Sequence, residues 1–117
     1  METKAGGCHC KAVRYEVTLD TAQPVIECNC SHCLPKGFLL TFVPKSAVTI
    51  LSGEDVLTEY LFNTKKIQHL FCSTCGIQSF GFGIGPDGVE TCAVNMRTLD
   101  DINLESLTRI PYDGKNS

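Results

Sequence analysis

The sequence predicts a mainly β protein, and two observations carry that prediction. Short apolar runs, rich in β-branched and aromatic residues, follow one another along the chain and are separated by glycine, proline and other turn residues. Helix signals are few and short. The chain has 117 residues, the size of one domain, and no linker or repeat divides it, so we expect residues 1–117 to fold as a single unit.

The strand signals begin at residues 12–17. There Val13, Tyr15 and Val17 alternate with polar side chains, so they share one face of the expected strand. Further strands are expected at residues 38–43, 47–51, 56–62, 67–71 and 89–94.

Residues 79–85 alternate large apolar side chains with glycine. A strand there has Phe80, Phe82 and Ile84 on one face and three glycines on the other. Such a glycine face permits close approach of a neighbouring backbone or of a ligand. Both tight sheet packing and a ligand surface remain open from the sequence.

The expected helices are short. Residues 34–37 indicate a turn or a single helical turn, and residues 99–107 indicate a short helix capped by Asp100 or Asp101. Residues 111–117 are polar and typical of a turn, and a loose tail is expected there.

Composition excludes several classes of protein. No apolar run approaches the roughly 20 residues of a membrane span. The net charge is −3 and the basic residues form no stripe, which argues against a nucleic-acid binder. Residues 1–7 lack the apolar segment of a signal peptide. We therefore expect a cytoplasmic protein, and in that reducing compartment clustered cysteines bind metal more often than they form disulfides.

Seven of the eight cysteines form three clusters, at residues 8–10, 28–33 and 72–75. Residues i and i+2 of a strand face the same way, so we expect Cys8 and Cys10 to point at one ion. The Cys72–Cys75 pair precedes Gly76, which lets the backbone fold back toward sulfur as in a zinc knuckle. These two pairs together make a closed, structural Cys₄ site, since zinc takes four tetrahedral ligands.

The remaining cluster offers three ligands. Cys28 and Cys30 pair by the same strand geometry, and Cys33 joins them if the chain turns before it. Three protein ligands and one exchangeable position are typical of a catalytic zinc. The alternative is a closed site completed by one of three other residues, namely His32, His69 or Cys92.

These motifs, in this order, resemble the glutathione-dependent formaldehyde-activating enzyme family, which also includes centromere protein V-like proteins. The resemblance spans nearly the whole chain. It is carried by Gly7-Cys8-His9-Cys10, Cys28-Asn29-Cys30-Ser31-His32-Cys33 with Lys36-Gly37, His69-Leu70-Phe71-Cys72-Ser73-Thr74-Cys75-Gly76, and Val94-Asn95-Met96-Arg97 with Leu99-Asp100.

The resemblance implies a β-tent fold, in which small antiparallel sheets meet around zinc. It implies two zinc ions per chain: a structural ion at Cys8, Cys10, Cys72 and Cys75, and a catalytic ion at Cys28, Cys30 and Cys33. The implied activity is a carbon–sulfur lyase that joins glutathione and formaldehyde reversibly as S-hydroxymethylglutathione. The chain departs from the family at Leu34-Pro35, where a basic or polar residue is common, and in the short stretch between Cys75 and Asn95.

The open site predicts that a substrate thiol becomes the fourth ligand and acts as the nucleophile. Lys36 and Arg97 are candidates to bind the carboxylates of a glutathione-like thiol, and Ser31 and His32 are candidates for proton transfer. One rival hypothesis is a zinc-stabilised binding module in which both ions are structural. The other is a centromere- or nucleic-acid-associated role, which only the resemblance suggests and which the acidic net charge opposes. Both a monomer and a homodimer are compatible with the sequence.

Overall fold

The computed structural model describes residues 1–61, 67–85 and 87–113, and it confirms a mainly β fold of the β-tent kind. A three-stranded sheet has the order β1 (Glu2–Gly7), β2 (Arg14–Leu19) and β5 (Val48–Ser52). A larger sheet has the order β10 (Arg109–Tyr112), β3 (Val25–Cys28), β4 (Leu40–Pro44), β9 (Glu90–Asn95), β8 (Gln78–Ile84), β7 (Gln68–Cys72) and β6 (Leu57–Tyr60). All pairings are antiparallel except that of β10 with β3, which is parallel.

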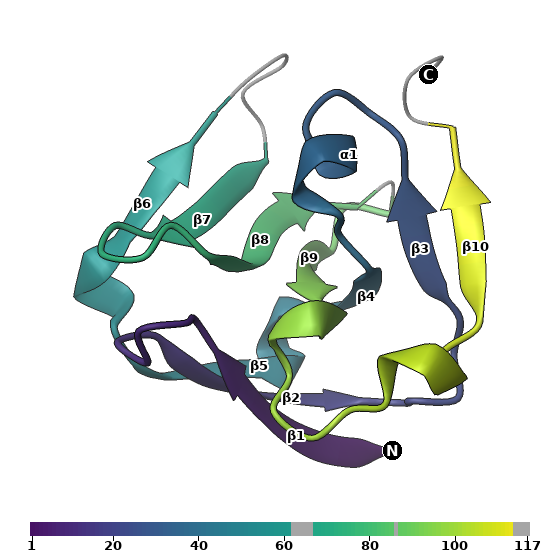
Figure 1. The fold of residues 1–117 in the computed structure, drawn as a ribbon, viewed down its shortest axis with the longest axis horizontal. Coiled ribbons are helices and arrows are strands. Elements are labelled where there is room, and N and C mark those ends of the chain that lie inside the picture. Colours follow the sequence, from purple (N-terminus) through teal and green to yellow (C-terminus); the bar gives the residue numbers. More distant parts are fainter. Residues whose placement is uncertain (62–66, 86, 114–117) are drawn as a thin grey trace.

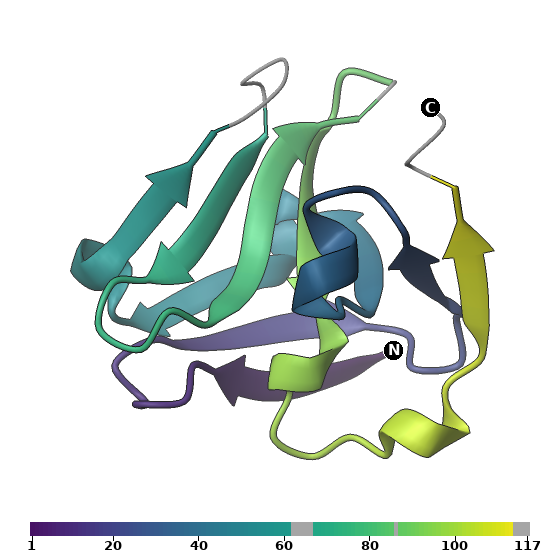
Figure 2. The ribbon, with the colours of Figure 1, turned by 45° about the horizontal axis from the view of Figure 1, so that its top comes forward.

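The larger sheet is strongly bent. Its β6–β7 side and its β3–β10 side lie on either side of helix α1 (Cys33–Lys36), and the three-stranded sheet lies below them (Figures 1 and 2). Gly37, in the left-handed conformation with φ 64°, caps α1, and its N–H bonds to the carbonyls of Cys33 and Leu34. The turn expected at residues 34–37 is therefore one helical turn that begins at Cys33. None of the helices in the described residues has the length and apolarity needed to cross a membrane.

Most of the expected strands are present with shifted ends. Residues 12–17, 38–43, 47–51, 67–71 and 89–94 correspond to β2, β4, β5, β7 and β9, and residues 79–85 to β8. Residues 56–62 correspond to β6, although Phe62 lies outside the described residues. The local sequence contains no clear strand signal for β1 and β3. These strands form by pairing with β2 and β10, respectively.

The helix expected at residues 99–107 is wrong. The backbone N–H of Asp100 donates to the carbonyl of Ala5 in β1, and the structure has only a 3₁₀ turn at Leu104–Ser106. Asn103 caps this turn by accepting the N–H of Glu105 at 3.1 Å. Leu99 and Leu107 are both buried, so they anchor the segment at its two ends.

The loose tail expected from residue 111 is wrong in part. Pro111 and Tyr112 belong to β10, and Tyr112 pairs with Cys28 of β3. This pairing is non-local, which explains why the local composition did not indicate it. Residues 114–117 lie outside the described residues.

The core lies between the two sheets. Val13, Tyr15 and Val17 are at most 1% exposed, which confirms the face expected from their alternation. Tyr15 meets Phe80 of β8 edge to face, with ring centroids 5.2 Å apart. Burial of a large apolar side chain contributes about 1.5–3 kcal/mol, so this layer stabilises the contact between the sheets.

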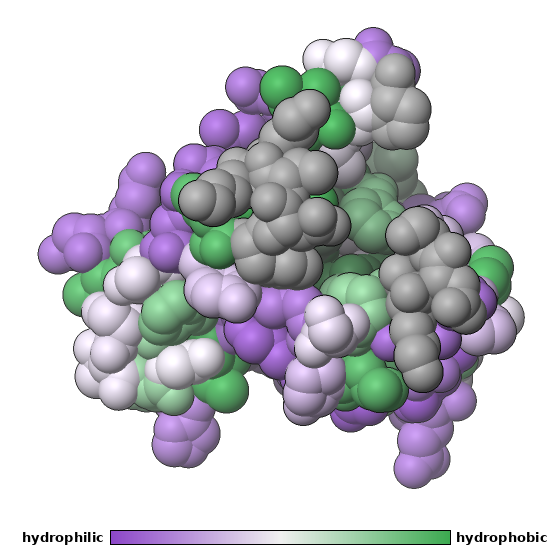
Figure 3. Space-filling view, turned by 90° about the horizontal axis from the view of Figure 1, so that it is seen from above, coloured by the Kyte–Doolittle hydropathy of each residue, from purple (hydrophilic) through white to green (hydrophobic). Residues whose placement is uncertain are grey.

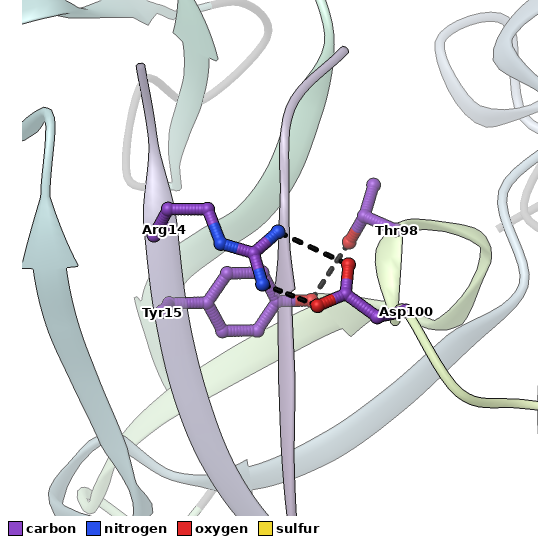
Figure 4. A network of polar contacts seen from close by, with 4 residues as sticks. All are labelled: Arg14, Tyr15, Thr98 and Asp100. Atoms are coloured by element: carbon purple, nitrogen blue, oxygen red, sulfur yellow. Dashed lines mark hydrogen bonds and ion pairs between the residues drawn. The ribbon is translucent and has the colours of Figure 1, made fainter. Parts of the chain in front are cut away.

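A polar network joins β2 to the turn that follows β9 (Figure 4). The Tyr15 hydroxyl lies 2.7 Å from Thr98 Oγ1, and burial raises the pKa of Tyr15 to about 12. Beside it, both terminal nitrogens of Arg14 bond to the carboxylate of Asp100. The two interactions hold Thr98 and Asp100, and therefore the backbone that directly follows Arg97, against the small sheet.

The glycine face of β8 serves sheet packing at one position and borders a hollow at others. A Cβ on Gly81 would lie 3.0 Å from the carbonyl of Gln68, so β7 packs closely against this position. A Cβ on Gly83 would make only ordinary contacts with Ile67. The hollow has a volume of about 540 Å³, and Phe42 and Ala93 also line it. Figure 3, a view from above, shows hydrophobic residues in several places on that face of the molecule.

Candidate metal centres

Four cysteines from distant parts of the chain meet at one point. Cys8 and Cys10 follow β1, Cys72 ends β7, and Cys75 lies in the turn before β8. Their sulfurs all lie within 4.8 Å of one another, and the Cys8–Cys10 and Cys10–Cys72 Sγ distances are both 3.6 Å. Four sulfurs bound tetrahedrally at 2.3 Å lie about 3.8 Å apart. This cysteine quartet therefore fits a single tetrahedral ion.

The local geometry of the Cys8–Cys10 pair differs from the expected strand. Strand β1 ends at Gly7, and the two cysteines lie in the turn before β2, where Lys11 adopts φ 68°. The Cys8 N–H donates to the Val13 carbonyl and the Val13 N–H lies 3.3 Å from Cys8 Sγ, so the turn, not a strand, directs the sulfur inward. At the other pair Gly76 has φ 83°, as a folded-back knuckle requires.

Backbone N–H groups favour thiolates at one end of the quartet. Those of Cys10 and Ile77 lower the pKa of Cys75 to about 6, and that of Cys75 lowers the pKa of Cys72. At Cys10 an N–H also lowers the pKa, but desolvation and bonds to the neighbouring thiols outweigh it and raise the pKa to about 11. Neighbouring thiolates repel each other, so a cation is needed to hold all four deprotonated.

The second cluster, the cysteine trio, consists of Cys28, Cys30 and Cys33. Cys28 ends β3 and Cys33 begins α1, while Cys30 lies in the connecting turn, so the expected strand pairing of Cys28 with Cys30 is wrong. The turn still brings all three sulfurs within 4.8 Å of one another. The Cys30 N–H points at Cys28 Sγ over 3.4 Å, and the Cys33 N–H points at Cys30 Sγ over 3.3 Å.

Burial and hydrogen bonding shift the thiol pKa in the same direction at Cys33 and in opposite directions at Cys30. Burial raises the pKa of Cys33 far above its ordinary value. At Cys30 burial also acts to raise the pKa, but the N–H and thiol of Cys33 outweigh it, and the pKa is lowered. The three half-buried sulfurs form a convergent donor set suited to a soft divalent ion.

No fourth metal-binding side chain joins the trio within residues 1–61, 67–85 and 87–113. His32 and His69 pack against each other, with ring centroids 4.2 Å apart, and His32 also stacks on Tyr60. Desolvation lowers the pKa of both histidines, that of His32 to about 4. Cys92 is fully buried in β9, where desolvation raises its pKa to about 12. Within the described residues, the site of the trio therefore has three protein ligands for a metal ion.

Helix α1 contributes residues to two clefts. One, of about 260 Å³, is lined by Cys28 and Cys33 together with Leu34, Phe38 and Pro111, and Arg97 lies on it. The other, of about 510 Å³, is lined by His32, Lys36, Tyr60 and Phe71 among others. The structure therefore places Arg97 beside the trio and Lys36 in a different cleft.

The two cations are held by different partners. Arg97 Nε donates to the carbonyl of Gly37 at 2.8 Å, and its backbone N–H bonds to the side chain of Asn95 at 3.2 Å. Lys36 Nζ donates to Gln78 Oε1 at 3.0 Å, and desolvation lowers its pKa. Arg97 is thereby fastened to the C-terminal end of the helix that Cys33 begins.

Sequence reasoning missed three residues of the trio's cleft. Leu34 stood out only as a departure from a family pattern, and Pro111 was assigned to a tail. Asn29 lies between two of the cysteines, and nothing in its local sequence indicated a partner. Only the parallel pairing of β10 with β3 brings Pro111 to this site.

Comparison with known proteins assigns the chain to a family. The sequence profile described as "Glutathione-dependent formaldehyde-activating enzyme" matches residues 3–110. A Penicillium rubens protein named "Putative glutathione-dependent formaldehyde-activating enzyme" is 35% identical over 85 residues, which are 66% of this chain and 44% of that protein. The chain thus spans less than half of this relative. The crystal structure of a Rhodobacter sphaeroides protein is 32% identical, with a TM-score of 0.79, over 92% of this chain and 97% of that one. The chain belongs to the glutathione-dependent formaldehyde-activating enzyme family.

Proposed function

We propose that this protein is a zinc-dependent carbon–sulfur lyase that forms and cleaves adducts between a thiol and an aldehyde. The observation that carries the proposal is the cysteine trio, whose three sulfurs converge and have no fourth protein ligand among the described residues. Two of its members, Cys28 and Cys33, line a cleft. Family membership supports glutathione as the thiol and formaldehyde as the aldehyde. Unoxidised clustered thiols are typical of the cytoplasm, where we place the activity.

The reaction joins the thiol sulfur to the aldehyde carbon, and the thiol proton ends on the aldehyde oxygen. Cys28, Cys30 and Cys33 would hold a zinc ion, which would supply the positive charge that keeps a substrate thiol deprotonated. The chain itself orients the sulfurs of Cys28 and Cys30 with the N–H groups of Cys30 and Cys33. Leu34, Phe38 and Pro111 provide apolar walls that limit water around the reacting sulfur.

Arg97 is the side chain we assign to the anionic part of the thiol. Its Nε is occupied by Gly37, and its guanidinium lies on the cleft that contains Cys28 and Cys33. A guanidinium offers further N–H donors in a planar fork, which suits a carboxylate. Lys36 lies in the neighbouring cleft, where it can serve only a substrate group that extends past α1.

Replacing Arg97 with alanine is expected to raise KM for a carboxylate-bearing thiol adduct by about tenfold or more, because a hydrogen bond to a charged group contributes about 1.5–3 kcal/mol. Steady-state kinetics with glutathione and with an uncharged thiol, each mixed with formaldehyde, measure this effect. Lys36→Ala is the matched control, with a smaller expected effect. Equal losses for the charged and the uncharged thiol in Arg97→Ala would contradict the assignment.

The function itself is tested by metal analysis combined with turnover. We expect two zinc ions per chain and reversible formation of the thiol–formaldehyde adduct. In a thiol-soaked crystal we expect a substrate sulfur as the fourth ligand at the trio. A binding module without activity would show four protein ligands at both ions and no turnover, and that result would refute the proposal.

A further inference from the structure

We propose that strand β10, acting through Asn29, sets the metal affinity of the cysteine trio. Asn29 is a positioning residue that lies between Cys28 and Cys30, and Asp113 is its side-chain partner across the strand pair. The inference rests on the trio being the metal site of the proposed function. It concerns metal affinity, which can be measured without any substrate.

Strand β3, which ends at Cys28, is held mainly by β10. Its register with β4 on one side consists of the single pair Ile26 and Leu40. On the other side, β3 pairs with β10 at every one of its residues, from Val25–Arg109 to Cys28–Tyr112. The position of Cys28 therefore depends on β10 more than on the rest of the sheet.

The contacts with β10 continue past Cys28 into the metal-binding turn. The Asn29 backbone N–H donates to the Tyr112 carbonyl at 3.1 Å. The Asn29 side chain, through Nδ2, donates to Asp113 Oδ1 at 3.0 Å. Both bonds act on the one residue that separates two ligands, so they orient the backbone from which both sulfurs project.

The cysteine quartet has no such dependence on β10. Its residues flank β1 and β2 on one side and β7 and β8 on the other. Among the described residues, strand β10 pairs with β3 alone, at the opposite edge of the larger sheet from β6 and β7. Loosening the contact between Asn29 and β10 should therefore weaken one metal site and spare the other.

Groups that orient metal ligands from outside the coordination sphere typically contribute 10–100-fold to metal affinity. The Asn29–Asp113 bond is exposed to solvent, so we expect an effect near the lower end of that range. Asn29→Ala and Asp113→Ala should each raise the zinc dissociation constant of the trio by about tenfold. The double variant should lose less than the sum of the two single variants, because both remove the same bond.

The test is chelator competition on the full chain, which resolves the weaker from the tighter zinc, with the cobalt-substituted protein as a second readout. In the single variants we expect weaker binding at one site only and a change in the thiolate–cobalt absorption of that site. Asp113→Asn keeps an acceptor oxygen and should restore nearly wild-type affinity. Asn103→Ala, which removes an exposed capping asparagine far from the trio in the chain, is the matched control and should change neither ion.

Unchanged dissociation constants in both alanine variants would overturn the inference, as would equal weakening of the two ions or additive losses in the double variant. Failure of the proposed function gives a different result. In that case the wild-type protein binds two zinc ions and shows no turnover, while the affinity difference between wild type and Asn29→Ala remains.

Discussion

Cys72→Ser is expected to unfold the protein. Structural zinc contributes about 10–16 kcal/mol of binding free energy that is largely folding free energy, whereas whole domains are stable by only about 5–15 kcal/mol. Cys72 is fully buried at the end of β7, and the quartet joins this strand to the turn between β1 and β2. Without the fourth sulfur, the metal ion no longer cross-links the small sheet to the larger one.

Circular dichroism, thermal unfolding and zinc content measure this outcome. Cys92→Ala is the matched control, since Cys92 is equally buried but belongs to neither cysteine cluster. We expect that variant to keep both ions and to lose about 1 kcal/mol of stability, as is typical of a point substitution. A Cys72→Ser protein that melts at the wild-type temperature would show that the quartet does not maintain the fold.

Cys30→Ser is expected to leave a folded protein that has one tightly bound zinc and no detectable turnover. Cys30 lies in a turn and is half-buried, and its side chain is no part of the apolar core, so the fold does not depend on it. Mutation of a group that only orients a metal ligand reduces activity by up to about hundredfold. Loss of a ligand itself should reduce activity further. A catalytic zinc needs three protein ligands, and the two remaining sulfurs do not meet that requirement.

Zinc stoichiometry after dialysis, thermal unfolding and the rate of adduct formation measure this second outcome, with Cys92→Ala again as the control. Two tightly held zinc ions in Cys30→Ser would show that Cys30 is not a ligand. Wild-type turnover in a variant with one zinc would place the chemistry away from the trio.

The contrast between Cys72→Ser and Cys30→Ser also distinguishes the two functional hypotheses. A lyase with an open site needs one ion for folding and another for chemistry, so the two substitutions should have different effects. In a binding module both ions stabilise the structure, and both substitutions should lower the melting temperature. The comparison requires only thermal unfolding and metal content.

Sequence alone determined the features that depend on local spacing. The alternation of Val13, Tyr15 and Val17 was sufficient to identify a buried face, because side-chain direction in a strand repeats every two residues. The grouping of cysteines into four and three followed from counting ligands against a tetrahedral ion, and the structure brings together those same sets. Gly76 was identifiable because a folded-back knuckle requires a positive φ.

Tertiary structure alone decided the features that depend on distant partners. Local composition indicated a tail at Pro111 and Tyr112, yet these residues form a strand because β3 offers them a free edge. The helix expected at residues 99–107 does not form because Ala5 of β1 accepts the N–H of Asp100. Lys36 and Arg97 were equivalent cations in the sequence. Their separation into two clefts follows from packing of the turn after β9 against Gly37, a contact between residues 60 positions apart that no local pattern encodes.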